Sequence, residues 1–373
     1  MSNSQESVEM NFETLGDQVE NPYLFRGPEG TPFLAPRGVY VANGMLFVSD
    51  TGRNRVFIWN QLPSSEFAEP DVVLGQSDSD SVGRNAGGVV TADTLQYPSG
   101  IWSDGEKLLV ADAWNHRVLV WHKMPTRNGQ PADVVIGQPD FTSNQPNVEG
   151  IGKDPNAKTL NWPYGLYSDG TQLWIADTGN RRVLYFEEIP TKNYSLADGV
   201  IGKPDMNTRD YENYEPIWPY SVKVNSSGQI IVSDTQFYRC HFWNHFQEAF
   251  EKPADIIIGQ PDFDACGQNQ FGLFPSSRSL NWTYDACFYK GGILVNDTGN
   301  SRILWFEKIP EANNPIAIAV IGKRDFTTGS ENSETVMGTS SSLYWPFSIT
   351  TADSKIVIAD TGNHRIVIAD LLI

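Results

Sequence analysis

Short apolar runs, broken by Gly, Pro, Asn and Asp, follow one another along the whole chain. Residues 45–48 and 55–59 are two such runs, and a turn of Thr-Gly-Arg-Asn type separates them. Runs of about five residues rich in Val, Ile and aromatic side chains predict β-strands. Gly and Asn tolerate the positive φ that tight turns demand. Because 32 Gly, 23 Pro and 12% aromatic residues fit the same interpretation, the chain is predicted to be all-β.

The pattern of strands and turns is periodic. Residues 48–56, Val-Ser-Asp-Thr-Gly-Arg-Asn-Arg-Val, return at 175–183 as Ile-Ala-Asp-Thr-Gly-Asn-Arg-Arg-Val. The aspartate of this motif recurs at intervals of 62, 65, 57, 63 and 63 residues, as Asp50, Asp112, Asp177, Asp234, Asp297 and Asp360. The spacing is too regular for chance and too short for separate domains, so it predicts six units of one repeat fold.

Each unit contains four candidate strands. In the first unit they are residues 36–41, 45–48, 55–59 and 71–76. Their nearly continuous apolar runs suit small sheets that neighbouring sheets cover on both faces. We therefore predict a six-bladed β-propeller with four antiparallel strands per blade, in which residues 1–373 form a single domain.

The sixth unit lacks a fourth strand, because the chain ends at Ile373 directly after its third. Residues 10–17 contain, at 15–16, the same Leu-Gly that the fourth strand of the first unit has at 74–75, about one repeat later. We predict that this N-terminal segment pairs with residues 366–368, closes the ring and covers an open sheet edge. Residues 1–9 are predicted to be a disordered tail.

Composition narrows the class of partner. The formal charge of −18 comes from 45 acidic and 27 basic residues, which makes nucleic acid a poor partner. No apolar run approaches the roughly 20 residues that span a bilayer, and the polar first residues do not resemble a signal peptide. A soluble, cytoplasmic protein without a membrane partner is expected. Three cysteines without a CxxC pair are expected to be reduced and mostly buried.

The motif Ala-Asp-Thr-Gly-Asn-x-Arg-Val resembles the NHL repeat, with Asp177, Thr178, Gly179, Asn180 and Arg182 matching in full. The resemblance covers nearly the whole chain and implies a six-bladed propeller. The Gly-Gln-Pro-Asp-Phe stretches at 137–141 and 259–263 are most similar to the long-repeat bacterial members. The fourth copy departs from the motif at 236–238. Proteins similar to this group include RNA-binding and partner-binding modules and a zinc-dependent lyase that cleaves peptidyl hydroxyglycine.

The recurring Asp and Arg of the motif have the residue types of an acid–base pair. A catalytic group needs one place with a perturbed environment, whereas these residues repeat in all six units. We expect the Asp to cap backbone donors of the turn and the Arg to bridge the hairpin or the neighbouring blade.

A binding site is expected where the connections between blades meet the channel, on the face that also carries the second-to-third turns. The residue after a repeated Pro (Thr283 in the fifth unit) varies from unit to unit, as Arg37, Ser99, Tyr164, Tyr220, Tyr284 and Phe347. We predict that these residues ring the channel mouth. If the ring binds a ligand, Arg37, Tyr164, Tyr220, Tyr284 and Phe347 should face the axis, free of the packing that fixes the neighbouring tryptophans. They would form either a concave amphipathic pocket for a ligand or an ordinary filled mouth. The recurring tryptophans before or near that Pro, Trp162, Trp218, Trp282 and Trp345, are expected to pack between blades.

Asp285 is the charged residue at a position where the other units have Gly or Ser. Near Arg37 on the ring, its carboxylate has three possible roles. It forms an ion pair, binds a cation together with backbone carbonyls, or acts as a base. The ion pair is the expected role, because a buried acid normally has a partner.

Catalytic chemistry has little support in the sequence. The five histidines do not converge on the channel, and there is no HxH, HExxH, Cys/His cluster, GxSxG or phosphate-binding glycine loop. No catalytic residue, metal or cofactor is therefore predicted. The leading interpretation is a non-enzymatic binding module or scaffold that recognises a protein, peptide or small ligand through Arg37, Tyr164, Tyr220, Tyr284, Asp285 and Phe347. The alternative is a hydrolase or lyase with its site around Asp285, Tyr284 and Arg37.

Overall fold

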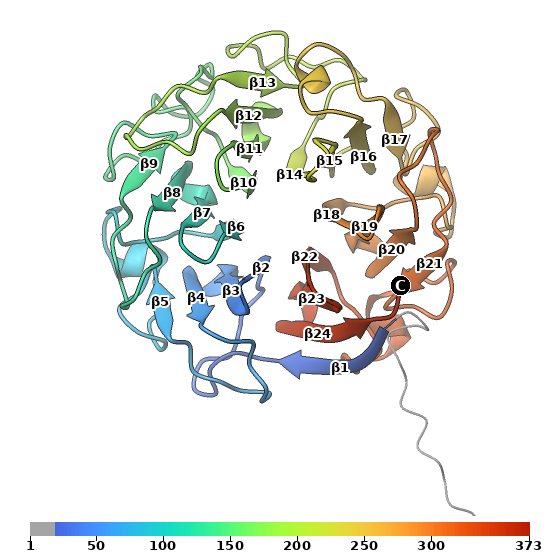
Figure 1. Cartoon of the computed structure of the whole chain (residues 1–373), viewed down its shortest axis with the longest axis horizontal. Coiled ribbons are helices and arrows are strands. Elements are labelled where there is room, and N and C mark those ends of the chain that lie inside the picture. Colours follow the sequence, from blue (N-terminus) through green and yellow to red (C-terminus); the bar gives the residue numbers. More distant parts are fainter. Residues whose placement is uncertain (1–18) are drawn as a thin grey trace, which may run out of the picture.

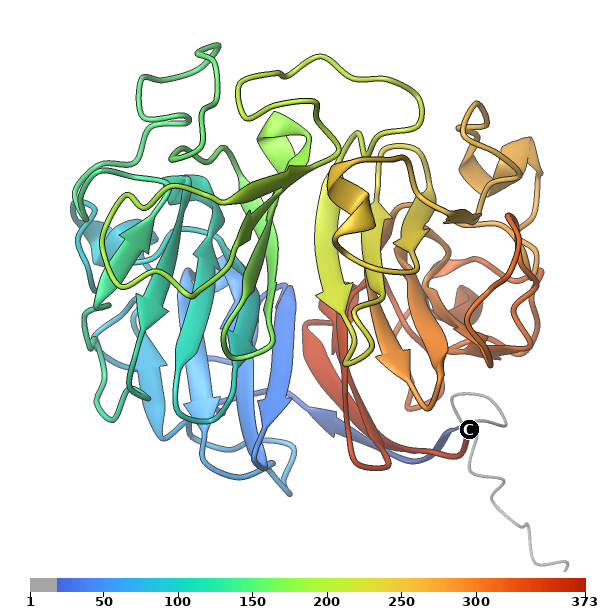
Figure 2. The same cartoon turned by 45° about the horizontal axis from the view of Figure 1, so that its top comes forward.

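The computed structural model describes residues 19–373, which form six four-stranded antiparallel sheets around a central axis (Figure 1). The sheets follow one another around the ring in chain order, so the predicted six-bladed β-propeller is confirmed. Several of the long connections between blades rise from one face of the ring (Figure 2).

Each blade runs outward from its first strand to its fourth. The innermost strands are β2 (Gly38–Ala42), β6 (Pro98–Ser103), β10 (Pro163–Ser168), β14 (Pro219–Val224), β18 (Thr283–Tyr289) and β22 (Pro346–Ala352). The second strands are β3 (Met45–Asp50), β7 (Leu108–Asp112), β11 (Leu173–Asp177), β15 (Ile230–Asp234), β19 (Gly292–Asp297) and β23 (Lys355–Asp360). The third are β4 (Arg55–Trp59), β8 (Arg117–Trp121), β12 (Arg182–Phe186), β16 (Arg239–Trp243), β20 (Arg302–Phe306) and β24 (Arg365–Leu371). The outermost are β5 (Val72–Leu74), β9 (Val134–Ile136), β13 (Gly199–Ile201), β17 (Ile256–Ile258), β21 (Ala319–Ile321) and, in the sixth blade, β1 (Val19–Phe25).

The turn between the second and third strands is a short 3₁₀-helix that ends in a left-handed residue. These helices are η1 (Thr51–Arg53), η3 (Ala113–Asn115), η4 (Thr178–Asn180), η7 (Thr298–Asn300) and η9 (Thr361–Asn363). The residue after each helix has φ between +53° and +60°. In the fourth blade Tyr238 takes the same conformation, at φ +52°, although its sequence departs from the motif. The remaining 3₁₀-helices are η2 (Arg84–Gly87), η5 (Glu248–Phe250), η6 (Gln268–Phe271) and η8 (Glu331–Glu334).

The ring closes through the N-terminal strand β1, which pairs antiparallel with β24 from Val19 opposite Leu371 to Phe25 opposite Ile366 (Figure 1). Closure by an N-terminal strand is thus confirmed. The strand that occupies this edge begins at Val19, later in the chain than the segment predicted from the Leu-Gly match. That segment, residues 10–17, and the predicted tail, residues 1–9, lie outside the described residues.

The hydrophobic core is divided among the interfaces between blades. One cluster joins Val110 and Leu119 of the second blade to Phe47 and Ile58 of the first. Five further clusters link the other neighbouring pairs in the same way, and the last joins β1 to the first blade through Phe25 and Phe33. Each blade therefore depends on both neighbours to bury its faces, as expected for a circular repeat fold.

Two further sequence expectations can be compared with the described residues. Among residues 19–373, no helix is long and apolar enough to cross a bilayer. All three cysteines are free, with Cys240 and Cys287 buried and Cys266 exposed.

Candidate functional site at the channel mouth

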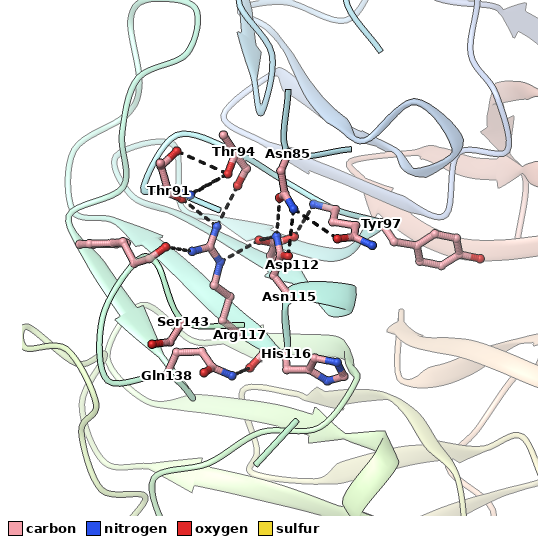
Figure 3. A network of polar contacts seen from close by, with 12 residues as sticks. Asn85, Thr91, Thr94, Tyr97, Asp112, Asn115, His116, Arg117, Gln138 and Ser143 are labelled. Carbon is pink, nitrogen blue, oxygen red and sulfur yellow. Dashed lines mark hydrogen bonds and ion pairs between the residues drawn. The ribbon is translucent and has the colours of Figure 1, made fainter. Parts of the chain in front are cut away.

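The repeated Asp and Arg form a buried structural network in each blade. The Arg bridges neighbouring loops as predicted, but the Asp accepts a backbone N–H of the connection before the first strand and does not cap the turn. In the second blade Asp112 accepts hydrogen bonds from the Gln96 backbone N–H at 2.7 Å and from Asn115 Nδ2 and Arg117 Nε at 2.8 Å (Figure 3). Arg117 donates its other N–H groups to backbone carbonyls of the loops on either side, at Thr91, Thr94 and Phe141. The Arg117 and Asp112 side chains are fully buried. The network therefore fixes the connection that carries the mouth residues.

A β-bulge directs the mouth residue toward the axis. In five blades the register between the first and second strands shifts directly after the first residue of the inner strand. In the third blade the pairing passes from Pro163 to Gly165, so Tyr164 is the extra residue. A bulge changes the direction of a side chain without ending the strand. The predicted ring residues consequently line one small axial cavity, together with Lys223.

In five blades the repeated Thr of the motif links the blade to the mouth of the next, a role that the sequence analysis did not identify; the second blade has Ala113 there. Thr178 Oγ1 donates to the carbonyl of Pro219, the residue before Tyr220, at 2.5 Å. Thr51 and Thr235 make the corresponding bonds to Pro98 and Thr283 at 2.6 and 2.7 Å. Both the bulge of the residue's own strand and the Thr of the preceding blade thus hold four mouth residues, Ser99, Tyr220, Tyr284 and Phe347.

The variable residue of the Asn-x-Arg turn also connects blades. In the second blade His116 Nδ1 accepts the backbone N–H of Trp162 at 3.1 Å. Asn54 makes the same contact to Tyr97 at 3.0 Å, and Ser301 to Trp345 at 3.2 Å. This position varies in sequence because several side-chain acceptors can make the same bond.

The contact of His116 predicts a pH effect. Burial lowers the pKa of His116 to about 4, and the ring accepts a hydrogen bond only while Nδ1 is unprotonated. The unfolded chain binds this proton near pH 6.5, so the stabilising effect is complete above about 6.5 and is lost as the pH falls toward 4. We expect the urea midpoint of His116→Asn to change less with pH over this range than that of the wild-type protein. Asn does not titrate here, and Asn54 makes the same contact in the first blade. Equal slopes in the variant and the wild-type protein would contradict this assignment.

The ring residues pack against one another and fill the mouth, contrary to the expectation that they stand free of packing. Tyr164 stacks on Tyr220 with ring centroids 4.8 Å apart, and Tyr220 meets the edge of Tyr284 at 4.4 Å. Phe347 lies 4.1 Å from Tyr284. Tyr220 and Phe347 are only 5% and 6% exposed. The rings fill the narrow mouth because four bulges deliver aromatic side chains to one axis.

Arg37 completes this plug. Its guanidinium lies over the ring of Phe347 at 4.1 Å and over that of Tyr97 at 5.0 Å. Nη1 donates to the Tyr220 hydroxyl at 3.2 Å, while Nε is buried without a hydrogen-bond partner. Among residues 19–373 no carboxylate forms an ion pair with Arg37. The mouth therefore contains a cation that two aromatic faces hold in place and that lacks a counter-charge.

The expected ion pair of Asp285 exists, but its partner is Lys223 rather than Arg37. Lys223 Nζ lies 3.4 Å from Asp285 Oδ1, while the Ser348 hydroxyl and the Ile349 backbone N–H donate to Oδ2 at 3.0 Å each. Three other blades have Gly at the position of Asp285, and in the third blade a Cβ at Gly165 would lie 2.2 Å from the Tyr220 carbonyl. Asp285 thus joins three blades beneath the ring, around a cavity of about 20 Å³. A cavity of this size holds about one water molecule.

Three of the four recurring tryptophans around the mouth are more exposed than expected, while Trp218 is half-buried. Trp162, Trp282 and Trp345 are 40%, 46% and 38% exposed, instead of being packed between blades. Each has φ between +46° and +50°, an unusual conformation for a bulky residue, which turns the ring outward. Trp114, also 38% exposed, stacks on Tyr97 at 4.6 Å. The four exposed tryptophans and Tyr97 form an aromatic rim around the plug. Trp114 could have been found from sequence, because four of the other five motif copies have Gly there.

Comparison with known proteins finds similar folds and does not identify a function. No family model and no curated protein matches the chain. Among solved structures, the hydrazine synthase of Kuenenia stuttgartiensis aligns at 10% identity over 91% of this chain and 96% of that chain, with a TM-score of 0.50. The computationally designed Ika8 protein aligns at 7% identity over 94% and 100%, with a TM-score of 0.44. A catalytically inactive virginiamycin B lyase from Staphylococcus aureus, solved with quinupristin, aligns at 11% identity over 94% and 99%, with a TM-score of 0.45. These similarities concern the fold alone.

Proposed function

We propose that this chain is a non-enzymatic binding module that takes a protein, peptide or small ligand on the aromatic mouth of its channel. The observation that carries the proposal is the Arg37 guanidinium, which is held between Phe347 and Tyr97 and has no carboxylate partner among residues 19–373. A charge that is partly removed from water is costly unless an opposite charge or a polar ligand compensates it. A ligand with an anionic group would supply that compensation.

The rim suggests what else such a ligand carries. The exposed faces of Trp162, Trp282 and Trp345 offer flat apolar surface, of the kind that aromatic and other planar groups bury on binding. Because the cavity beneath the ring has only about 20 Å³, the ligand would lie on the plug and not enter the channel. We therefore propose a ligand that combines one anionic group for Arg37 with a flat apolar part for the rim.

The enzymatic alternative is less well supported. Both carboxylate oxygens of Asp285 have partners, in Lys223 and in hydrogen bonds from the Ala286 and Ile349 backbone and Ser348. A carboxylate with this set of contacts serves as a cross-link, and it is not placed beside an open cavity where a substrate could reach it. Nucleic acid remains a disfavoured partner because of the charge of −18.

Membership of the NHL-repeat family, of the long-repeat bacterial type, is also a proposal. It rests on the motif around Asp177 and Arg182 and on the regular spacing of its copies. A cytoplasmic location is proposed from the free state of Cys240, Cys266 and Cys287, since reduced thiols are typical of that compartment.

A pair of small probes that differ only in charge tests the mouth. We expect N-acetyl-L-phenylalanine to quench the rim tryptophans and to bind about tenfold more tightly than its neutral amide, because hydrogen bonds to charged groups are the stronger ones. Arg37→Gln should remove this preference, and Trp345→Ala should weaken both probes. Fluorescence titration measures all three effects.

Arg127→Gln is the matched control, because Arg127 is exposed and its replacement changes the net charge by the same amount as Arg37→Gln. It should leave the preference for the acid unchanged. Equal binding of acid and amide by the wild-type protein, no binding of either, or an equal effect of Arg127→Gln would each contradict the proposed site.

A further inference from the structure

A cleft of about 690 Å³ opens between two neighbouring connections on the face that carries the channel mouth. One wall is the connection from the fourth blade to the fifth, with η6, and the other is the connection from the fifth blade to the sixth, with η8. The turn η7 lines the cleft as well, and this side of the ring is drawn in orange (Figure 2). The volume is typical of ligand-binding clefts, and the cleft shares no lining residue with the axial cavity at the mouth.

The side-chain amide of Asn281 belongs to this cleft and has no hydrogen-bond partner. Asn281 lines the cleft but is only 5% exposed, and its Oδ1 is buried without a partner. Its Nδ2 makes no hydrogen bond to any of residues 19–373 either. Because buried amides are normally bonded, this one lacks an interaction that a ligand could supply.

Asn281 is held in place although its amide is unbonded. Its backbone N–H donates to Asp297 Oδ1 at 2.7 Å, and its carbonyl accepts the Gly299 N–H at 2.7 Å. The side chain packs on Gly299, where an added Cβ would lie 2.5 Å from Asn281 Cγ. The amide is therefore positioned before a ligand arrives, which lowers the entropic cost of binding.

The hydroxyl of Ser330, on the other connection, is a second unbonded group. Ser330 lines the cleft, and its Oγ is buried without a partner. By contrast, Asn269 and Asn300, which also line the cleft, donate to each other at 3.1 and 2.8 Å. Among the buried side-chain polar groups of the cleft in the described residues, those of Asn281 and Ser330 alone lack partners.

The remaining walls are close to neutral and include an aromatic ring. The charged side chains that line the cleft are Arg324 and Glu334, one of each sign, and both are exposed. Such a balance does not favour a ligand with a net charge. Phe274 also lines the cleft and is 71% exposed, so its ring is available to a flat apolar group.

We propose that this cleft binds a neutral saccharide. A sugar hydroxyl both donates and accepts, so it suits the amide of Asn281 in either orientation and the rotating hydroxyl of Ser330. The C–H face of a pyranose ring is apolar and rests on Phe274. This site and the anion site around Arg37 use different residues, so the two proposals stand or fall independently.

Saturation-transfer difference NMR with the methyl glycosides of glucose, galactose, mannose and N-acetylglucosamine tests the cleft. We expect at least one of them to bind saturably, with a Kd of roughly 1 mM, because a single ring makes few contacts. Asn281→Ala should weaken this binding about tenfold, and Phe274→Ala should weaken it and reduce the transfer to the ring C–H protons. Since the Asn281 side chain makes no hydrogen bond, its replacement should leave the melting temperature within a few degrees of the wild-type value.

The third blade supplies a matched control. Asn161 packs on Gly179 as Asn281 packs on Gly299, and it lies outside the cleft, so Asn161→Ala should bind the glycosides like the wild-type protein. Phe271→Ala is the control for the aromatic ring, because Phe271 is 82% exposed and does not line the cleft.

L-serine, a zwitterion that could pair with Arg324 and Glu334, is the charged counterpart of the glycosides and should not bind. Binding of L-serine in place of every glycoside would overturn the proposal in favour of an amino-acid site. Absence of binding of all four glycosides, or equal losses in the two control variants, would overturn it as well. Arg37→Gln should leave glycoside binding unchanged, which separates this result from that for the mouth.

Discussion

Replacing Asp177 with Ala is expected to lower the free energy of unfolding by about 3–5 kcal/mol, because it leaves a buried arginine without its counter-charge. The side chains of Asp177 and Arg182 are fully buried, and Arg182 Nε lies 2.8 Å from Asp177 Oδ2. Asp177 also accepts hydrogen bonds from the Asn161 backbone at 2.7 Å and from Asn180 at 2.8 Å. The loss therefore exceeds that of one ordinary hydrogen bond, which is about 1 kcal/mol.

Urea unfolding followed by circular dichroism measures this difference. Asp154→Ala is the control, because Asp154 is exposed and lies outside these networks, and its effect should stay within about 0.5 kcal/mol. Binding at the mouth should survive in the folded fraction of Asp177→Ala. A variant of unchanged stability that had lost a specific activity would contradict the structural role.

The fold could be predicted from sequence because the apolar runs, the turn residues and the repeat spacing all indicate the same structure. The Asp and Arg of the motif mark the same turn in every unit, and the runs on either side of this turn are the second and third strands. Only the position of the closing strand differed. A short resemblance such as Leu15-Gly16 is weak information about a pairing partner, whereas the register with β24 places Val19 opposite Leu371.

The candidate site could be predicted in position but not in packing. The sequence placed Tyr164, Tyr220 and Phe347 around the axis, and all three line the axial cavity. It could not show that their rings touch, because that depends on the distance between strands of different blades. Nor could it show that Lys223 reaches Asp285 across a blade boundary, or that positive φ turns Trp345 toward solvent.

Removing β1, by deleting residues 1–25, is expected to abolish cooperative folding or to lower the melting temperature by well over ten degrees. Val19 and Phe25 are fully buried, and Phe25 packs edge-on against Phe33 of the first blade and Trp59, with centroids 5.4 and 5.0 Å apart. Emptying a site of this kind costs about 3–5 kcal/mol for one aromatic ring. The deletion also exposes β24 as an unprotected sheet edge, which favours aggregation.

A separate variant keeps this prediction decisive even if the deleted chain is insoluble. Phe25→Ala retains the strand and its pairing with β24 but removes the ring that contacts Phe33 and Trp59, so it should melt well below the wild-type protein. A chain without residues 1–9, the predicted tail, is the control and should melt like the full chain. Wild-type melting of the 1–25 deletion would contradict the prediction, because it would mean that the contacts of β22 and β23 with β2 close the ring without the fourth strand of the sixth blade.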